Sequence, residues 1–240
     1  CMVHGRPKSP VFDCNPNAAA SDRASFARFS SRSATSSGFN HYSLAPDDAL
    51  LRSLSRSYAD PNGPMAVSNS DPSWDRGICN GADWYVVRGG MQDWNYVWRG
   101  DPEVTLEIGT IKWPAGSTLP QFWEENRESM LAFFERAQDG VRGLVRDINT
   151  GLPLKAGVRI TGVTSNGATT WSDPDVGDFH KLLLPGRYDL EVSATGYATA
   201  YLRDVVVPDG PAVRWDVWLQ PLSTNLQPTG YQVRDAGDAE

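Results

Sequence analysis

The stretch that decides the fold is DWYVVRGGMQDWNYVWRGDPEVTLEIGTIKWP, residues 83–114. Aromatic residues crowd its first half, a Gly-Gly pair lies at 89–90, and an alternating apolar run follows at 104–108. Such alternation predicts a β-strand with its apolar side chains on one face. The other face of this strand carries one carboxylate, that of Glu107. An ionised side chain in such a strand needs a physical reason.

Three explanations suit Glu107 from the residues alone. It faces solvent at the edge of a sheet, it pairs with a cation such as Lys112, or it lines a functional site. The end of a central strand is a position where α/β enzymes keep acid–base groups. Tyr85, which precedes the Gly-Gly turn, raises the same question, with packing at the core or rim as the simpler explanation. The alternating aromatic residues at 94, 96 and 98 are expected in a strand or in the core, although an aromatic row can also stack on sugars or bases.

The composition of the 240 residues limits the classes of function. Apolar residues make up 40% and charged residues 21%, which is enough to build a buried core. The formal net charge is −7, so a basic face for nucleic acid is not expected. No apolar run reaches the length of about eighteen residues that would predict a membrane span.

The three cysteines are Cys1, Cys14 and Cys79. None of them forms a C-x-x-C pair, which argues against a zinc ribbon or a redox motif. They allow at most one disulfide, and buried or incidental thiols are the simpler explanation. Because the chain starts at Cys1 rather than at Met, we expect that its true beginning is missing.

The first part of the chain is predicted to be mixed α/β. Residues 44–64 carry Pro46, Asp47 and Asp48 as start signals, continue with leucines at helical spacing and end in DPNGP, which predicts a helix. Residues 120–138 predict a second helix with an apolar face. Residues 1–40 are rich in Ser, Ala and Arg and are expected to be a divergent, poorly ordered segment. The α/β part is therefore expected over residues 41–138.

Beyond residue 139 the pattern changes to short strands separated by turns. Alternating residues at 188–192 and 213–219 predict two of the strands, and Asn-Thr-Gly, Pro-Gly and Asp-Gly turn signals recur at a spacing typical of sandwiches. Residues 139–221 are therefore predicted to form a small all-β sandwich. The polar remainder, 222–240, is expected to be a tail.

Several segments carry a resemblance in the same order along the chain. They are YSLAPDDALLRSLSRSYAD (42–60), NGADWYVVRGGMQDWNYVW (80–98), EVTLEIGTIKWP (103–114) and LPQFWEENRESMLAFFERAQDGVRGLV (119–145). They resemble the zinc metallocarboxypeptidases, and among these the regulatory branch with carboxypeptidases D, E, M and N. GVRGLVRDINTGLPLKAGVRI and DPDVGDFHKLLLPGRYDLEVSATGY resemble the transthyretin-like domain that follows the catalytic domain in that branch. The resemblance implies the C-terminal half of a catalytic domain over 41–138 and a transthyretin-like sandwich over 139–221.

The resemblance also implies roles for individual residues. Glu107 falls on the family's catalytic glutamate, which takes a proton from a zinc-bound water and passes it to the leaving amine. Tyr85 falls on the mobile tyrosine that closes over the substrate, and Gln92 falls on the floor of the pocket for the C-terminal side chain. Asp13, in PVFDCNPN, resembles the aspartate that pairs with a basic substrate side chain, although a loop aspartate is the alternative. These positions together imply a preference for Lys or Arg.

The zinc ligands of the family, two histidines and a glutamate, are matched only in part. The H-x-x-E motif that supplies two of them is absent, because none of the three histidines is followed by Glu at that spacing. His4, in VHG, resembles the family's third ligand in LHGG, although the RPKSP that follows does not resemble the expected apolar strand. His41 is expected in a loop, and His180 in the sandwich.

Two functions follow from this pattern. The chain is a C-terminal piece of a zinc carboxypeptidase with a disturbed start, or a short protein that has lost catalysis and binds a partner. The first implies Zn²⁺ as cofactor, peptide or protein C-termini as partners, proteolysis of C-terminal basic residues, and a secreted, periplasmic or extracellular location. The second would use Trp171, Trp215 and Trp218 of the sandwich as contacts. The 240-residue chain alone is expected neither to hold zinc nor to hydrolyse peptides.

Overall fold

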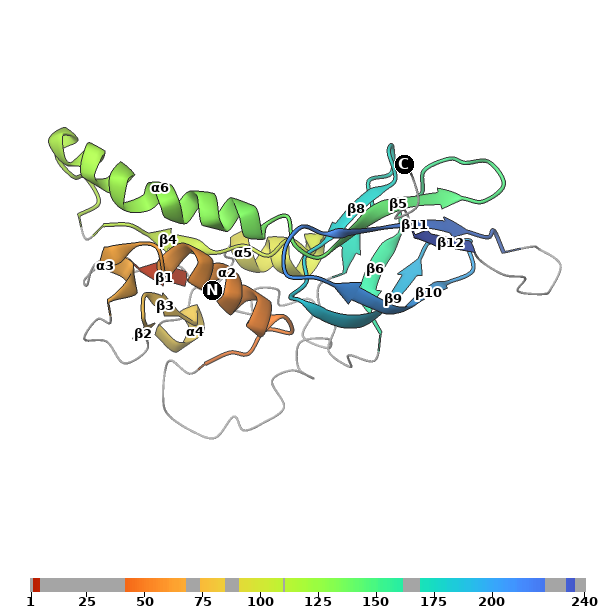
Figure 1. Cartoon of the computed structure of the whole chain (residues 1–240), viewed down its shortest axis with the longest axis horizontal. Helices are drawn as coiled ribbons and strands as arrows, with labels where there is room; N and C mark the ends of the chain where they lie inside the picture. Colours follow the sequence, from red (N-terminus) through yellow and green to blue (C-terminus); the bar gives the residue numbers. More distant parts are fainter. Residues whose placement is uncertain are drawn as a thin grey trace. The chain divides into compact units, whose positions relative to one another are not determined.

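The computed structural model, shown in Figure 1, contains two compact units. The first unit comprises Cys1–Val97 and Pro102–Ala137, and the second comprises Trp98–Asp101 and Gln138–Glu240. The residues that the structure describes are 2–4, 42–67, 74–84, 91–109, 111–161, 169–222 and 232–235.

Two long helices of the first unit confirm the helices predicted from the sequence. Helix α2 (Asp48–Ala59) buries the predicted apolar face, and helix α6 (Leu119–Arg136) packs against it. Helix α2 contributes buried apolar residues to the interface, whereas the buried residues of α6 are Asn126 and Ser129, with Met130 and Phe133 partly buried beside them. The shorter helical segments are α3 (Gly63–Ala66), α4 (Gly81–Trp84), α5 (Met91–Trp94), a π-helix (Asn95–Arg99) and a 3-10 turn (Gly116–Thr118).

A small mixed sheet completes the described part of the first unit. Its strand order is β2-β3-β1-β4. Strand β1 runs parallel to β4 and antiparallel to β3. The combination of helices with a mixed sheet agrees with the predicted α/β class. The strands are β1 (Met2–His4), β2 (Trp74–Asp75), β3 (Ile78–Cys79) and β4 (Thr105–Glu107).

A buried polar cluster joins α2, α3 and α6. The Oδ1 atom of Asn126 in α6 accepts hydrogen bonds from the Tyr58 hydroxyl at 2.9 Å and from Nδ2 of Asn62 at 3.1 Å. The Oδ1 atom of Asn62 caps α3 by accepting the backbone N–H of Met65 at 3.1 Å. Asn126 also donates through Nδ2 to the carbonyl of Phe122 at 2.7 Å. Because these groups are buried, each lost partner would leave a desolvated polar atom.

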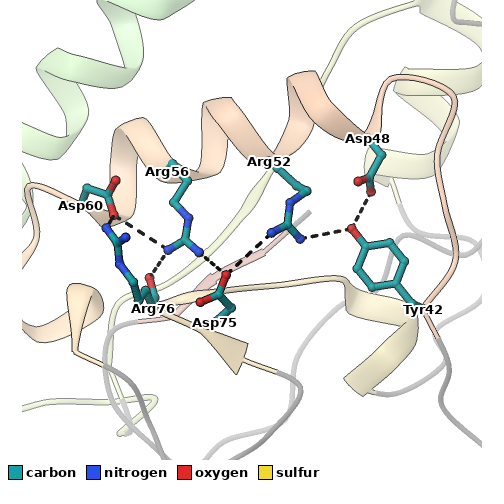
Figure 2. A network of polar contacts seen from close by, with 7 residues as sticks. All are labelled: Tyr42, Asp48, Arg52, Arg56, Asp60, Asp75 and Arg76. Atoms are coloured by element: carbon teal, nitrogen blue, oxygen red, sulfur yellow. Dashed lines mark hydrogen bonds and ion pairs between the residues drawn. The ribbon is translucent and has the colours of Figure 1, made fainter.

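An exposed network of charges connects α2 to the hairpin of β2 and β3 (Figure 2). Arg56 and Arg52 both pair with Asp75 of β2, the latter at 3.7 Å. Arg76, in the turn of the hairpin, pairs with Asp60 at 2.6 Å. Solvent screening leaves each such pair with a small contribution to stability, so the network orients the hairpin more than it stabilises it. Its seven members are Tyr42, Asp48, Arg52, Arg56, Asp60, Asp75 and Arg76.

The aromatic run at 94–98, expected in a strand or in the core, is helical and forms no strand. Trp94 ends α5, and Tyr96 and Trp98 lie in the π-helix. The Tyr96 hydroxyl donates to Asp47 Oδ2 at 2.9 Å and accepts the Asp47 backbone N–H at 3.1 Å, next to the start of α2. This tertiary contact outweighs the strand propensity of the aromatic residues, which is weak and context-dependent.

The apolar sides of β4 and α6 are less covered than the sequence predicts. Leu106 and Ile108 are 38% and 44% exposed. On α6, Phe133 packs against α2, whereas Trp123 and Phe134 are more than half exposed. The described elements of the first unit therefore cover one side of α6 only.

The second unit contains the predicted β-sandwich, built from two four-stranded sheets. The strand orders are β10-β9-β6-β7 and β12-β11-β5-β8. The strands are β5 (Val141–Asp147), β6 (Gly157–Ile160), β7 (Thr170–Trp171), β8 (Asp178–Lys181), β9 (Gly186–Ser193), β10 (Ala200–Val207), β11 (Val213–Leu219) and β12 (Gln232–Asp235). Strand β12 lies within the segment expected as a tail and pairs with β11.

Side chains of both sheets fill one apolar core between them. Leu190 and Val192 of β9 and Val217 and Leu219 of β11 are fully buried, as their alternation predicts. Burial of these side chains supplies the main driving force for this unit. The other buried members of the core are Val141, Val145, Ala156, Val158, Phe179, Leu183, Ala200, Leu202, Val205 and Val207.

Strand β10 is the outer strand of its sheet and contains a bulge. Its register with β9 shifts between Leu202 and Val205, and Asp204 takes a positive φ of 54°. The Asp204 backbone N–H donates to Asp189 Oδ1 at 2.8 Å, and Arg187 holds both carboxylate oxygens of Asp204 at 2.7 and 2.8 Å. These contacts offset the strain of a non-glycine residue with positive φ.

Asp147 closes the turn that follows β5. Its Oδ1 accepts the backbone N–H groups of Asn149 and Thr150 at 2.7 and 2.9 Å, and its Oδ2 accepts the Tyr197 hydroxyl at 2.7 Å. The bond from Tyr197, followed by that from Thr150, holds the pKa of the Asp147 carboxyl below its usual range. The ionised form is therefore the one that the folded state prefers.

Asn126→Ala is expected to lower the free energy of unfolding of the first unit by about 2 kcal/mol, because Tyr58 and Asn62 lose their acceptor in the interior. Urea unfolding followed by far-UV circular dichroism measures this change. Ser129→Ala on the same helix is the matched control, since Ser129 Oγ is buried without a hydrogen-bond partner in the described part of the chain. Equal losses in the two variants would refute the role of Asn126.

Asp147→Asn is expected to lower the melting temperature of the sandwich above about pH 4, where an unfolded aspartate is ionised. The folded-state pKa of Asp147 is depressed, so its contribution is present above that pH and is lost as the pH falls through the folded pKa. The melting temperatures of wild type and variant should therefore converge in acid. A constant difference at every pH would show that charge is not the cause.

Candidate active site

Glu107 is the last residue of β4, and its side chain is half-buried. Burial disfavours the charged form and raises the pKa of the Glu107 carboxyl, and the positive charge of Lys112 counteracts part of this rise. A carboxylate with a raised pKa can accept a proton and return it nearer neutral pH than an exposed one. This environment suits the proton-transfer role that the sequence predicts.

Gln92 lies beside the strand that carries Glu107. It belongs to α5, it is buried, and its Nε2 donates to Thr105 Oγ1 at 2.9 Å. Thr105 and Glu107 are two residues apart in β4, so their side chains leave the same face of the strand. The structure thus brings Gln92 and Glu107, two of the predicted site residues, to one side of β4.

His4 meets the same strand through its backbone. Strands β1 and β4 are parallel, and His4 is in register with Glu107. Tyr85 and Asp13, together with the Gly-Gly pair at 89–90, lie outside the residues that the structure describes. Three of the five predicted site positions are thus found on β4 or next to it.

Thr105 is a site residue that the sequence analysis did not single out. It fixes the orientation of the Gln92 side chain through the hydrogen bond to its hydroxyl. The available signal was its position two residues before Glu107 on the same face of a strand. A threonine in a strand is so common that this position alone does not distinguish it from a packing residue.

A small apolar cavity of about 170 Å³ also touches β4. Tyr58, Phe133, Val104 and Leu106 line it, together with Pro102 and Glu103. Leu106 lies between Thr105 and Glu107 in sequence, so it points away from the face that carries Glu107. This cavity is therefore separate from the candidate site.

The described residues do not fit a zinc site. They contain no group of three or more His, Cys, Asp or Glu side chains that could hold a metal ion. His180 lies in β8 of the second unit, where its Nε2 bonds to the carbonyl of Asp139 at 2.8 Å. Among the same residues, no helix combines the length and the apolar character that crossing a membrane requires.

Comparisons with known proteins identify both units. Residues 21–129 match the family model of the zinc carboxypeptidases, and residues 140–220 match that of the carboxypeptidase regulatory-like domain. The chain is 39% identical to carboxypeptidase D of Mus musculus over 194 residues. It is 41% identical to carboxypeptidase E of Caenorhabditis elegans over 174 residues and 34% identical to the carboxypeptidase N catalytic chain of Mus musculus over 187 residues.

The two matches in this order define a carboxypeptidase-type α/β segment followed by a regulatory-like β-domain. The chain belongs to the zinc carboxypeptidase family, as its sequence motifs predict. The three alignments cover 78%, 66% and 78% of this chain, but 14%, 36% and 40% of the respective relatives. The chain thus spans less than half of the length of these relatives, so their activity does not follow for it from similarity alone.

Glu107→Gln is expected to raise the thermal stability of the first unit at neutral and alkaline pH, because it removes a charge that burial disfavours. The folded-state pKa of Glu107 is raised, so its protonated form matches the neutral amide in acid, and the difference should vanish as the pH falls through that pKa. Thermal melts of both proteins across pH measure this effect. A stability gain that persists unchanged in acid would mean that burial of the charge is not its origin.

Proposed function

We propose that the chain provides part of a metallocarboxypeptidase that removes C-terminal residues from peptides. The observation that carries this proposal is the hydrogen bond from Gln92 to Thr105, two residues from Glu107 in β4. This hydrogen bond supports the proposal that Gln92, as the pocket floor, and Glu107, as the proton acceptor, line the same side of the site. Residues 41–138 would be the C-terminal half of the catalytic domain, and residues 139–221 a transthyretin-like domain between a divergent segment, 1–40, and a tail, 222–240.

Each candidate residue has a distinct task. Glu107 takes a proton and returns it to the leaving amine, for which its raised pKa is suited. Gln92 contacts the C-terminal side chain of the substrate from below, and Tyr85 closes over the bound peptide. Asp13 pairs with a Lys or Arg side chain, which gives the preference for basic residues.

Zinc is the cofactor of the family, and it would supply the nucleophilic water of the complete enzyme. The chain lacks the H-x-x-E motif, and its described residues hold no ligand cluster. His4, in register with Glu107, is the candidate for one ligand. The other two ligands would come from polypeptide outside these 240 residues, so we expect no hydrolysis by the chain alone.

The substrates would be the C-termini of peptides or proteins, and the net charge of −7 makes nucleic acid an unfavourable partner. A secreted, periplasmic or extracellular location is proposed as well. Its support is the similarity to the carboxypeptidases named above.

The test begins with the complete transcript that encodes the chain. An H-x-x-E segment upstream of residue 1 is expected, and the protein that includes it should bind zinc and release C-terminal Arg or Lys from a peptide. In that protein Glu107→Gln should lower kcat by about 10²–10⁴, with thermal melting as the control for folding. The absence of such a segment from every reading frame would refute the enzyme. Stoichiometric zinc binding by the 240-residue chain alone would refute the proposed origin of the ligands.

The second candidate function is a non-catalytic binding protein. The observation in its favour is the missing ligand cluster in the described residues. Among the sandwich tryptophans, Trp171 is 49% exposed and lies under Lys155 Nζ at 5.7 Å, whereas Trp215 packs against the core and Trp218 is half-buried. Trp171 is thus the tryptophan among the three that best suits a contact surface.

A further inference from the structure

Three basic side chains form a row across the sheet that contains β8, β5 and β11. Arg142 of β5 is in register with His180 of β8 on one side and with Arg214 of β11 on the other. All three side chains are exposed, whereas Val141 and Val145 beside Arg142 in the chain are fully buried in the core. The row therefore lies on the outer face of the sheet, with neighbouring strands about 5 Å apart.

Two members of the row already have partners. Arg214 donates from Nε and Nη2 to the two carboxylate oxygens of Asp216 at 3.1 and 3.0 Å. The Nε2 atom of His180 donates to the carbonyl of Asp139, which can only accept. For the Arg142 guanidinium, no hydrogen bond or ion pair occurs with any residue that the structure describes. Arg142 is thus the member of the row with its donors available.

Arg142 and Arg214 lie opposite each other in neighbouring strands. Like charges opposite each other in neighbouring strands destabilise a sheet. The carboxylate of Asp216 accepts hydrogen bonds from Arg214 and from the backbone N–H of Leu144, the latter at 3.0 Å. Arg142 therefore forms no ion pair with a described residue, in a protein whose net charge is −7. A binding role would explain why this charge is unpaired.

We propose that the row is a docking surface for an acidic peptide segment of a partner protein. A guanidinium with unoccupied donors binds a carboxylate in a bidentate geometry. Leu144 lies two residues along β5 from Arg142, and Trp218 is in register with Arg146 further along the same outer face. Both are half-buried and add apolar surface to this face. The surface therefore combines an available arginine with the apolar and aromatic groups that anchor peptides.

The charges around the row favour spaced carboxylates over a dense polyanion. Asp178, exposed and in register with Leu144, and Asp216 lie one step along the strands from the row. They would repel the continuous negative charge of a nucleic acid, a sulfated polysaccharide or an anionic bilayer. A peptide can place one carboxylate over Arg142 and neutral residues over these aspartates.

The experiment uses the full chain and a labelled synthetic peptide in which Glu alternates with Ser and Leu. Fluorescence anisotropy at low salt should show binding of this peptide and none of the same peptide with Gln in place of Glu. Arg142→Gln should weaken binding about fivefold. Arg159→Gln should leave it unchanged, because Arg159 pairs with Glu191 at 2.7 Å on the other sheet. Both variants have the same net charge, so non-specific attraction affects them equally.

The Arg142→Lys variant distinguishes the effect of the positive charge from that of the bidentate guanidinium geometry. It also serves as a second variant if Arg142→Gln does not fold. It keeps the positive charge, so it should fold like wild type and bind with intermediate affinity. No binding of the Glu peptide, or equal weakening by Arg142→Gln and Arg159→Gln, would overturn the proposal. Tighter binding of heparin or phosphatidylserine vesicles than of the peptide would also overturn it, in favour of a polyanion surface.

Discussion

A single buried oxygen, Oδ1 of Asn126, constrains the first unit more than any charge on its surface. It accepts two hydrogen bonds, one from α2 and one from the cap of α3, and thereby fixes α6 against both. Helix α2 in turn packs on strands β1 and β3, and β1 lies beside the strand that ends in Glu107. The position of the candidate site thus depends on the Asn126 side chain, which has a structural role only.

The exposed network in Figure 2 acts differently. Its ion pairs lie in water, where attraction and the cost of ordering long side chains nearly cancel. They specify where the hairpin of β2 and β3 lies on α2 rather than how firmly it is held. The buried amide of Asn126 therefore contributes mainly to stability, whereas the exposed arginines mainly orient the hairpin of β2 and β3.

The candidate site combines two opposing electrostatic effects on one carboxylate. Exclusion of water raises the pKa of Glu107, and the charge of Lys112 pulls it back. The hydrogen bond between Gln92 and Thr105 holds a neutral amide on the same side of β4 without adding charge. A neutral neighbour leaves this balance to burial and to the positive charge of Lys112.

The sequence predicted those elements whose local pattern and tertiary environment agree. Helices α2 and α6 and the sandwich strands have clear periodicity, and the apolar faces of α2 and of the sandwich strands are buried. A strand around Tyr96 was expected from the alternation of aromatic residues, but the segment is a π-helix. The hydrogen bond of the Tyr96 hydroxyl to Asp47, which the local pattern does not encode, favours the helix. Motif resemblance singled out Glu107 and Gln92 as candidates, but the contact through Thr105 depends on the course of the chain between 92 and 105, which no spacing rule encodes. Strand β12 was missed because four paired residues in a polar segment leave no apolar signal.

The bulge in β10 has a consequence for how the molecule meets copies of itself. An outer strand normally offers a straight row of N–H and C=O groups on which another chain can add a strand. In β10 the shift at Leu202 and Val205 breaks that row, and Asp204, clamped by Arg187, places paired charges at the break. A second molecule could continue the ladder for only a few residues on either side. The same side chains that relieve local backbone strain therefore also protect this edge of the sandwich against strand addition by another molecule.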